Sequence, residues 1–202
     1  MSPFPESLDI NMMTKKEIRK KARTDRVELS IAQTMEKNTA ITSRIIRDSE
    51  FRDAHTVLLY HSINNEVDTS KIFQAAISMG IRVGFPRIEG EDMNFYQVTK
   101  EEDLEYGFMG IMEPKADPAT LIDTEDAIVF APGVAFDEKC NRTGYGRGFY
   151  DRYFQSHPGV IKIGLAYELQ VYPEIEVDER DVPLDFIITE SRIIAHERYH
   201  HK

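Results

Sequence analysis

A run of alternating glycines is the segment whose residue types best suit chemistry. Gly144, Gly146 and Gly148 lie within the sequence Arg142-Thr143-Gly144-Tyr145-Gly146-Arg147-Gly148-Phe149-Tyr150-Asp151-Arg152. Glycine permits positive φ angles and close backbone approach, and the amides of such a loop can bind an anion at a helix start. The three arginines suit phosphate oxygens. We interpret the segment as a polyphosphate site, although spacing alone equally allows a glycine-rich turn with exposed arginines.

The spacing of these glycines differs from that of the common nucleotide-binding motifs. A Walker A loop requires G-x-x-x-x-G-K-[ST], and neither Lys-Ser nor Lys-Thr follows the glycines. The dinucleotide fingerprint G-x-G-x-x-G is also absent, because the spacing here is G-x-G-x-G. Any polyphosphate site is therefore of another type.

Two charged segments accompany the glycine loop. Residues 14–28 carry seven Lys or Arg and three acids, whereas residues 165–190 carry eight acids and one arginine. Alone, the basic segment is better explained as a solvated helix face, but beside the loop it would focus an anion into one cleft. Mg²⁺ binds through one or two carboxylates and substrate phosphates, which makes Asp178, Asp181 and Asp185 candidates. Taken singly, each is better explained as a surface acid.

Three helices are expected to position these groups. Thr14-Lys15-Lys16-Glu17 and Ser30-Ile31-Ala32-Gln33 have the form of capping boxes, and predict helices ending near residues 28 and 48. Met35, Ile41, Ile45 and Ile46 would face the core from the second helix. Asp68 would cap a third helix that Gly80 ends.

Apolar runs between and after these helices predict strands. They cover residues 56–60, 81–85, 94–98, 127–131, 160–167 and 186–189, and Pro86 is expected to end the second. Strands separated by helices predict an α/β fold with an open, mostly parallel sheet and helices on both faces, of unspecified strand order. Ligands of such sheets bind beyond the carboxyl ends of the strands.

Composition limits the class of protein. The 202 residues predict one domain, and the net charge of −10 argues against binding nucleic acid or an anionic membrane surface. The single cysteine, Cys140, excludes an intramolecular disulfide and a cysteine-rich zinc site. We expect a disordered leader over residues 1–13, a single domain over 14–196 and a tail over 197–202, with His200 and His201 solvated. Without a targeting or membrane segment, we expect a cytoplasmic monomer.

Several motifs together resemble the 5-formyltetrahydrofolate cyclo-ligase (methenyltetrahydrofolate synthetase) family. The main block is P-G-x-x-F-D from Pro132, followed by R-x-G-x-G-x-G-[YF]-Y-D from Arg142. Lys15 and Arg19 match its Lys-x-x-x-Arg, residues 61–67 match a strand-exit loop with a glutamate, and residues 110–114 match G-x-x-E-P. The resemblance covers roughly residues 15–190 and implies a fold like that of sugar-phosphate isomerases and CoA transferases.

The resemblance implies ATP-dependent closure of 5-formyltetrahydrofolate to 5,10-methenyltetrahydrofolate, with release of ADP and phosphate. Arg142 and Arg147 would be catalytic, and Asp151 and Asp181 would bind Mg²⁺. Glu66 would bind the pterin ring. It implies ATP contacts from Lys15, Lys16, Arg19, Arg142, Gly144, Gly146, Arg147, Gly148 and Tyr150. It implies folate contacts from His61, Glu66, Tyr145, Gly146, Arg147, Gly148 and Phe149.

Three positions depart from the family pattern, and two other functions remain as alternatives. Cys140 stands where glycine is frequent, Thr143 replaces a usual leucine, and Phe149 stands where tyrosine is common. None of these departures removes a charged group. The alternatives are a sugar-phosphate isomerase or CoA-transferase-like enzyme that needs no ATP, and a non-catalytic folate- or nucleotide-binding paralogue. The sequence leaves open the nucleotide preference and whether the folate is polyglutamylated.

Overall fold

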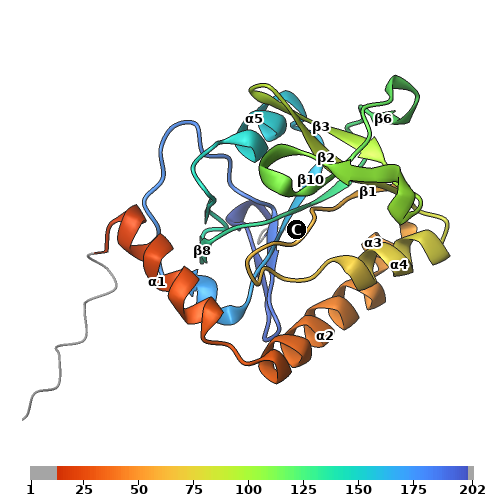
Figure 1. Ribbon diagram of the computed structural model, residues 1–202. Helices are drawn as coiled ribbons and strands as arrows, with labels where there is room; N and C mark the ends of the chain where they lie inside the picture. The colour runs from red at the N-terminus through yellow and green to blue at the C-terminus, as the bar shows by residue number, and fades with distance from the viewer. Residues whose placement is uncertain (1–12, 200–202) are drawn as a thin grey trace, which may run out of the picture.

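An eight-stranded sheet in the order β13-β12-β10-β7-β1-β2-β3-β6 forms the centre of the computed structural model, which describes residues 13–199 (Figure 1). The five strands from β12 to β2 run parallel, whereas β13, β3 and β6 pair antiparallel at the two edges. This confirms the expected open, mostly parallel α/β sheet. The strands are β1 (Thr56–Leu58), β2 (Arg82–Glu89), β3 (Asp92–Gln97), β6 (Leu121–Ile122), β7 (Ile128–Ala131), β10 (Ile161–Leu165), β12 (Phe186–Ile188) and β13 (Ile193–Ala195).

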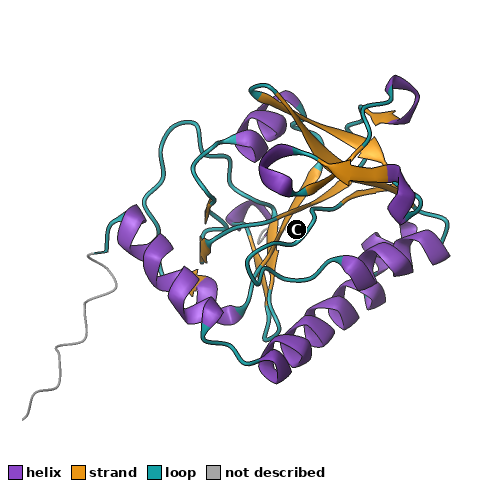
Figure 2. Cartoon of the chain, in the orientation of Figure 1, coloured by secondary structure: helices purple, strands orange, loops and turns teal. Residues whose placement is uncertain are grey.

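Helices cover both faces of the sheet, as predicted (Figure 2). All four residues of β7 are buried, and alternate residues enter different cores. Ile128 and Phe130 pack with α2 (Ile31–Arg47), α3 (Ser49–Asp53) and α4 (Ser70–Ser78). Val129 and Ala131 pack on the other face with α5 (Phe149–Ser156). A strand buried on both faces is apolar at every position, which is why this run has no polar alternation.

The helix starts follow the predicted capping chemistry. Both predicted capping boxes are present, at Thr14 before α1 (Lys15–Val27) and at Ser30 before α2. The third helix begins later than expected: Thr69 is its N-cap, and Asp68 accepts a hydrogen bond from the Ser70 amide. The core assignment of Met35 was wrong, because its side chain is 64% exposed on the outer face of α2.

Pro86 does not end its strand, contrary to expectation. β2 continues to Glu89, and Pro86 pairs with Phe95 of the antiparallel strand β3. The other neighbour, β1, pairs only with residues 82–84, so Pro86 lies beyond the end of that ladder. A residue without an N–H is tolerated where one side of a strand has no partner.

Short strands outside the main sheet escaped prediction. β11 (Val171–Tyr172), β8 (Ala135–Asp137) and β9 (Arg142–Thr143) form a second sheet, and β4 (Leu104–Tyr106) pairs with β5 (Met112–Pro114). The glycine loop therefore connects β9 to α5 and does not follow the central strand β7 directly. Helix α1 packs beside β8 and the 3-10 helix η5 (Glu168–Gln170), and buries Ile18 and Ala22 there (Figure 1).

The chain ends expected to be irregular are only partly covered. Residues 1–12 of the predicted leader lie outside the described residues, as do His200 and His201. Residues 197–199, assigned to the tail, form the 3-10 helix η6 (Glu197–Tyr199), in which the Tyr199 hydroxyl donates to Asp185 at 2.8 Å. Within residues 13–199, no helix combines the length and apolar character needed to cross a bilayer.

Candidate functional site

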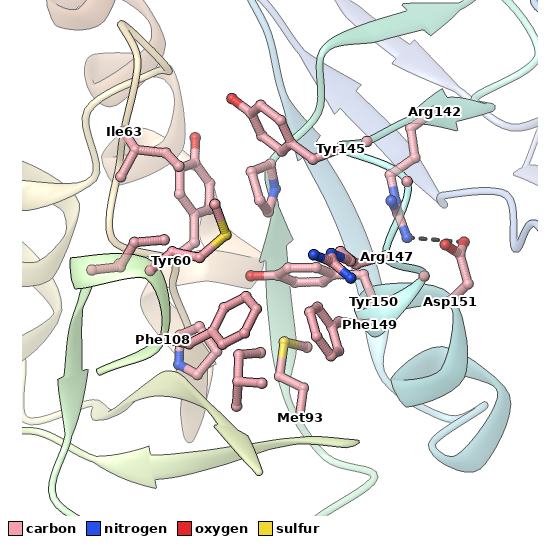
Figure 3. Close-up of a pocket in the computed structure, with 18 of the residues that line it drawn as sticks. Tyr60, Ile63, Met93, Phe108, Arg142, Tyr145, Arg147, Phe149, Tyr150 and Asp151 are labelled. Atoms are coloured by element: carbon pink, nitrogen blue, oxygen red, sulfur yellow. Dashed lines mark hydrogen bonds and ion pairs between the residues drawn. The ribbon is translucent and has the colours of Figure 1, made fainter. Parts of the chain in front are cut away.

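A cavity of about 1210 Å³ lies at the carboxyl ends of the central strands (Figure 3). Tyr60 follows β1 and Pro132 follows β7, and both line the cavity. The position agrees with the rule for open α/β sheets. Sequence-predicted residues that line it are Lys15, Arg19, His61, Glu66, Arg142, Gly144, Tyr145, Gly146, Arg147, Gly148, Phe149, Tyr150, Asp151, Asp178 and Asp181.

Lys16 and Asp185 are predicted site residues that the fold does not bring to this cavity, and Lys16 is displaced by the geometry of its helix. It is exposed and lines a separate surface hollow along α1, together with Lys20 and Arg23. Successive helical residues are rotated by about 100°, so Lys15 and Lys16 cannot face the same side. The expectation that Lys16 contacts the triphosphate is therefore not supported by its position.

The glycine loop forms the wall of the cavity from β9 to α5. Gly146 has φ +90° and Gly148, the N-cap of α5, has φ +68°, which explains why glycines occupy these two positions. The Arg147 side chain extends into the middle of the cavity beside the Tyr150 ring (Figure 3). Among residues 13–199 it has no hydrogen-bond or ion-pair partner, so its guanidinium can bind a ligand anion.

Three further cations of the cavity are held by protein side chains. Arg142 is buried and its Nη2 lies 2.9 Å from Asp151 Oδ1 (Figure 3). The Lys15 Nζ lies 2.6 Å from Asp181 Oδ2, and the Arg19 Nε donates to the Thr143 hydroxyl at 2.7 Å. This contact uses only the Nε of Arg19, so the two terminal guanidinium nitrogens are available to other partners. With Arg147, Arg152 and Arg180, which also line the cavity, these cations surround one space, which is favourable for a polyanion.

The arrangement of Asp151 and Asp181 fits Mg²⁺ shared with phosphates. Oδ1 of Asp151 accepts from the Val182 amide, which places it beside Asp181 in space. Asp151 Oδ2 and Asp181 Oδ1 accept no hydrogen bond from residues 13–199. That part of the chain holds no cluster of three or more His, Cys, Asp or Glu suited to a metal. Two carboxylates that share an ion with substrate phosphates meet the usual requirement of Mg²⁺. Asp185 is excluded, because it is buried against Lys162 and Arg198.

Glu66 forms the polar end of the cavity on the side of β1. Its Oε2 accepts from the Ile63 amide at 3.0 Å and its Oε1 from the Tyr145 hydroxyl at 2.9 Å. Asn64 and Asn65 have positive φ angles of 50° and 58°, which close the turn that presents the carboxylate. Burial raises the pKa of Glu66, and these hydrogen bonds and Arg26 oppose the increase. The carboxylate can still accept from adjacent ligand N–H groups through its remaining lone pairs.

The cavity has an apolar wall, of which the sequence analysis named only Phe149 as a ligand contact. It comprises Ile88, Met93, Phe108, Ile111 and Phe149, and the Phe108 and Phe149 rings meet edge to face at 6.1 Å (Figure 3). No local pattern marks these residues, because they come from β2, β3, a 3-10 turn and α5. Such a wall suits the flat face of an aromatic or pterin ring.

The segment that carries Phe108 is fixed by a buried glutamate. Glu113 accepts hydrogen bonds from the Phe108 and Ile88 amides, and burial raises its pKa. A Cβ on Gly107 would lie 2.1 Å from Glu113 Oε2, so only glycine fits at that close approach. The G-x-x-E-P segment thus shapes the apolar wall.

Tyr150 presents a buried polar atom to the site. Its hydroxyl oxygen is buried without a hydrogen-bond partner among residues 13–199, and its ring lies 5.6 Å from the Arg142 guanidinium carbon. A buried hydroxyl without a partner is unfavourable. Because Tyr150 lines the cavity, a ligand can supply the missing partner.

The three departures from the family pattern have local explanations. Cys140 has φ +63°, a conformation that glycine adopts freely, and its buried side chain lies in the core between α5 and the sheet. Thr143 provides the hydroxyl that holds Arg19. Phe149 contributes its ring to the apolar wall and lies 5.2 Å from the Arg152 guanidinium carbon.

Comparisons with known proteins agree in what they match. A sequence model of the 5-formyltetrahydrofolate cyclo-ligase family matches residues 11–190. A probable 5-formyltetrahydrofolate cyclo-ligase of Schizosaccharomyces pombe is 32% identical over 77% of this chain and 84% of its own. The 5-formyltetrahydrofolate cyclo-ligase of Haemophilus influenzae is 29% identical over 87% and 97%. The solution structure of Aquifex aeolicus 5,10-methenyltetrahydrofolate synthetase superimposes with a TM-score of 0.81 at 31% identity, covering 94% of this chain and all of that one.

Proposed function

This chain belongs to the 5-formyltetrahydrofolate cyclo-ligase family, and we propose that it closes 5-formyltetrahydrofolate to 5,10-methenyltetrahydrofolate at the expense of ATP. Family membership supports cyclo-ligase activity on this substrate. The dependence on ATP, the role of Mg²⁺ and the residue assignments below are parts of the proposal.

One observation carries the proposal: a polyanion site and a pterin-sized apolar site share a single cavity. Lys15, Arg19 and Arg147 line the same cavity as Glu66 and the apolar wall. The volume of about 1210 Å³ exceeds what one drug-sized ligand commonly occupies. The cavity is therefore large enough to hold two reactants side by side, which is the arrangement a phosphoryl transfer between them needs.

The chemistry begins with a poor leaving group. The oxygen of the formyl group carried by N5 would attack the γ-phosphorus of ATP. An O–P bond forms as the bond between the γ-phosphorus and the ADP oxygen breaks. N10 then adds to the activated carbon and loses its proton, and the C–O bond breaks to release phosphate. Atoms and charges balance as methenyl product, ADP and phosphate. The attacking oxygen carries no proton, so we assign no general base.

The protein contributes position and charge. Arg147, Arg142 and the other cations would offset the charge on the phosphoryl oxygens, which is the main requirement of phosphoryl transfer. Glu66 would orient the pterin by accepting from its adjacent N–H groups. The apolar wall would cover the pterin ring and exclude water from the activated carbon.

Mg²⁺ fits at Asp151 and Asp181, as the arrangement of these carboxylates indicates. Bound there, it would neutralise phosphate charge during transfer. Lys15 and Arg142, the present partners of the two carboxylates, would remain close enough to the same phosphates to assist.

Purified protein tests the proposal through the absorbance of the methenyl product. We expect product from 5-formyltetrahydrofolate only when ATP and Mg²⁺ are both present, with ADP formed in equal amount. Product without ATP would contradict the ATP-dependent step, and absence of both product and folate binding would leave the isomerase-like alternative. Binding of both ligands without product would identify a non-catalytic paralogue. A substrate with ¹⁸O in the formyl group tests the mechanism, since the label must appear in the released phosphate.

The cytoplasmic location and the monomeric state remain predictions. Cell fractionation and light scattering on the purified protein would test them.

A further inference from the structure

Arg26 is a buried guanidinium that the sequence analysis counted only as part of a basic helix. Its side chain is 2% exposed. Nη1 donates to the Gly133 carbonyl at 3.5 Å and Nη2 to the Tyr145 hydroxyl at 3.2 Å, whereas Nε is buried without a partner among the described residues. None of the described carboxylates lies within ion-pair distance of it. A buried charge with so little compensation is costly, so its presence calls for a function.

Tyr145 connects this guanidinium to Glu66. The Tyr145 hydroxyl accepts from Arg26 Nη2 and donates to Glu66 Oε1 at 2.9 Å. One hydroxyl therefore separates the cation from a carboxylate that is itself 6% exposed. The second carboxylate oxygen is held by the Ile63 amide. The chain Arg26–Tyr145–Glu66 joins α1, the glycine loop and the loop after β1.

The spacing on α1 places this contact in line with the phosphate-facing cations. Lys15, Arg19 and Arg26 are separated by four and seven residues, which puts them on one face of a helix with 3.6 residues per turn. Lys15 and Arg19 line the cavity, and Arg26, near the other end of the same helix, connects to Glu66 through the Tyr145 hydroxyl. A single rigid element thus supports both halves of the site.

Arg26 is the cation that acts on Glu66. Burial raises the pKa of Glu66, and the Arg26 charge lowers it. Apart from His61, tyrosines provide the other titratable groups around the carboxylate, and burial raises the pKa of each tyrosine, so they stay neutral near pH 7. The titratable residues that face it are Arg26 from α1, Tyr60 and His61 after β1, Tyr145 and Tyr150 from the glycine loop and α5, and Tyr167 after β10.

We propose that Arg26 is a positioning residue for the folate substrate, which fixes Glu66 through the Tyr145 hydroxyl and keeps its carboxylate ionised toward the pterin. The inference rests on the proposed function and deepens it. It predicts that Arg26 governs folate binding, although it lies on the helix that carries the phosphate-binding cations.

The test is the dissociation constant of 5-formyltetrahydrofolate as a function of pH, by titration calorimetry. In Arg26→Gln we expect about tenfold weaker binding at pH 7.5, a loss equivalent to about 1.4 kcal/mol. The acid limb, which is the fall in folate affinity at low pH, should also move to higher pH in this variant, because Glu66 then protonates more easily. Arg26→Lys keeps the charge and should keep the limb closer to that of the original protein. Affinity for a non-hydrolysable ATP analogue should change less than about twofold.

Tyr145→Phe provides an independent test if Arg26→Gln does not fold. The ring is 41% exposed, so losing its hydroxyl should be tolerated, and the folate affinity and acid limb should change in the same direction. Lys20→Gln, an exposed change on the same helix, is the control and should alter neither. If Arg26→Gln or Tyr145→Phe folds and its folate affinity and acid limb are unchanged, the inference is overturned and the proposed function is not affected. Failure of the original protein to bind this folate would overturn the proposed function and the inference together.

Discussion

Lys15 and Asp181 form an ion pair of 2.6 Å although 166 residues separate them in the chain. The pair holds the start of α1 against the acidic segment that precedes β12. It also joins a residue expected to bind phosphate with one expected to bind Mg²⁺. In the proposed complex, Mg-ATP would supply a cation for the carboxylate and an anion for the ammonium, so both residues could exchange partners without leaving a charge unpaired.

Arg147→Ala should nearly abolish turnover while leaving the fold intact. One electrostatic contact to a transferring group contributes about 3 kcal/mol, so kcat should fall by about 100-fold. The side chain has no partner within residues 13–199, so the melting temperature should stay within about 2 °C. Arg47→Ala, an exposed arginine at the end of α2, is the matched control. Unchanged turnover in folded Arg147→Ala would refute the assignment.

Glu66→Gln should weaken folate binding and leave ATP binding largely intact. A neutral amide presents one acceptor oxygen where the carboxylate presents two. Burial raises the pKa of Glu66, so in the original protein the carboxylate protonates at a higher pH than an exposed glutamate, and folate affinity should fall as the pH drops through that pKa. The glutamine variant should lose this acid limb. Binding titrations from pH 5 to 8 measure it, and equal damage to both ligands would contradict the role.

Asp181→Asn should increase the Mg²⁺ concentration needed for half-maximal turnover. Losing one of two carboxylate ligands weakens binding of the ion, and we expect about a tenfold increase, equivalent to about 1.4 kcal/mol. The folate dissociation constant should not change. Glu179→Gln, in the same exposed segment and outside the cavity, serves as the control. An unaltered Mg²⁺ requirement in Asp181→Asn would remove Asp181 from the metal site.

Tyr150→Phe should lower activity without lowering stability. Its hydroxyl is buried without a partner in the part of the chain that the structure describes, so removing it should be neutral or stabilising. If a ligand supplies that partner, kcat/KM should fall by about tenfold. Tyr153 has an equally unpartnered hydroxyl but does not line the cavity, so Tyr153→Phe should leave kcat/KM unchanged. Equal kinetics in the two variants would place Tyr150 outside the site.

Patterns within one element were readable from the sequence, whereas contacts between distant elements were not. The capping boxes and the buried strand at residues 128–131 depend on local spacing, and these predictions are confirmed. The prediction that Pro86 ends its strand was wrong, because a strand tolerates proline where its neighbour has ended. Where β1 ends is a property of strand pairing. The short strands β8 and β9 span too few residues to show a period.

The same limit applies to the site. Motif resemblance named Glu66 and five cations, and the fold brings all of them except Lys16 to one cavity. The apolar wall is assembled from four separate elements, so no local sequence pattern indicates it. Lys16 and Arg26 were both counted as basic residues of one helix, but helical rotation exposes the first and buries the second.

A crystal structure with 5-formyltetrahydrofolate and a non-hydrolysable ATP analogue tests the shared cavity most directly. We expect the terminal phosphate within hydrogen-bond distance of Arg147, the pterin N–H groups on Glu66, and the formyl oxygen facing the γ-phosphorus. Either ligand bound outside this cavity, or the two bound with the formyl oxygen turned away from the phosphate, would contradict the account.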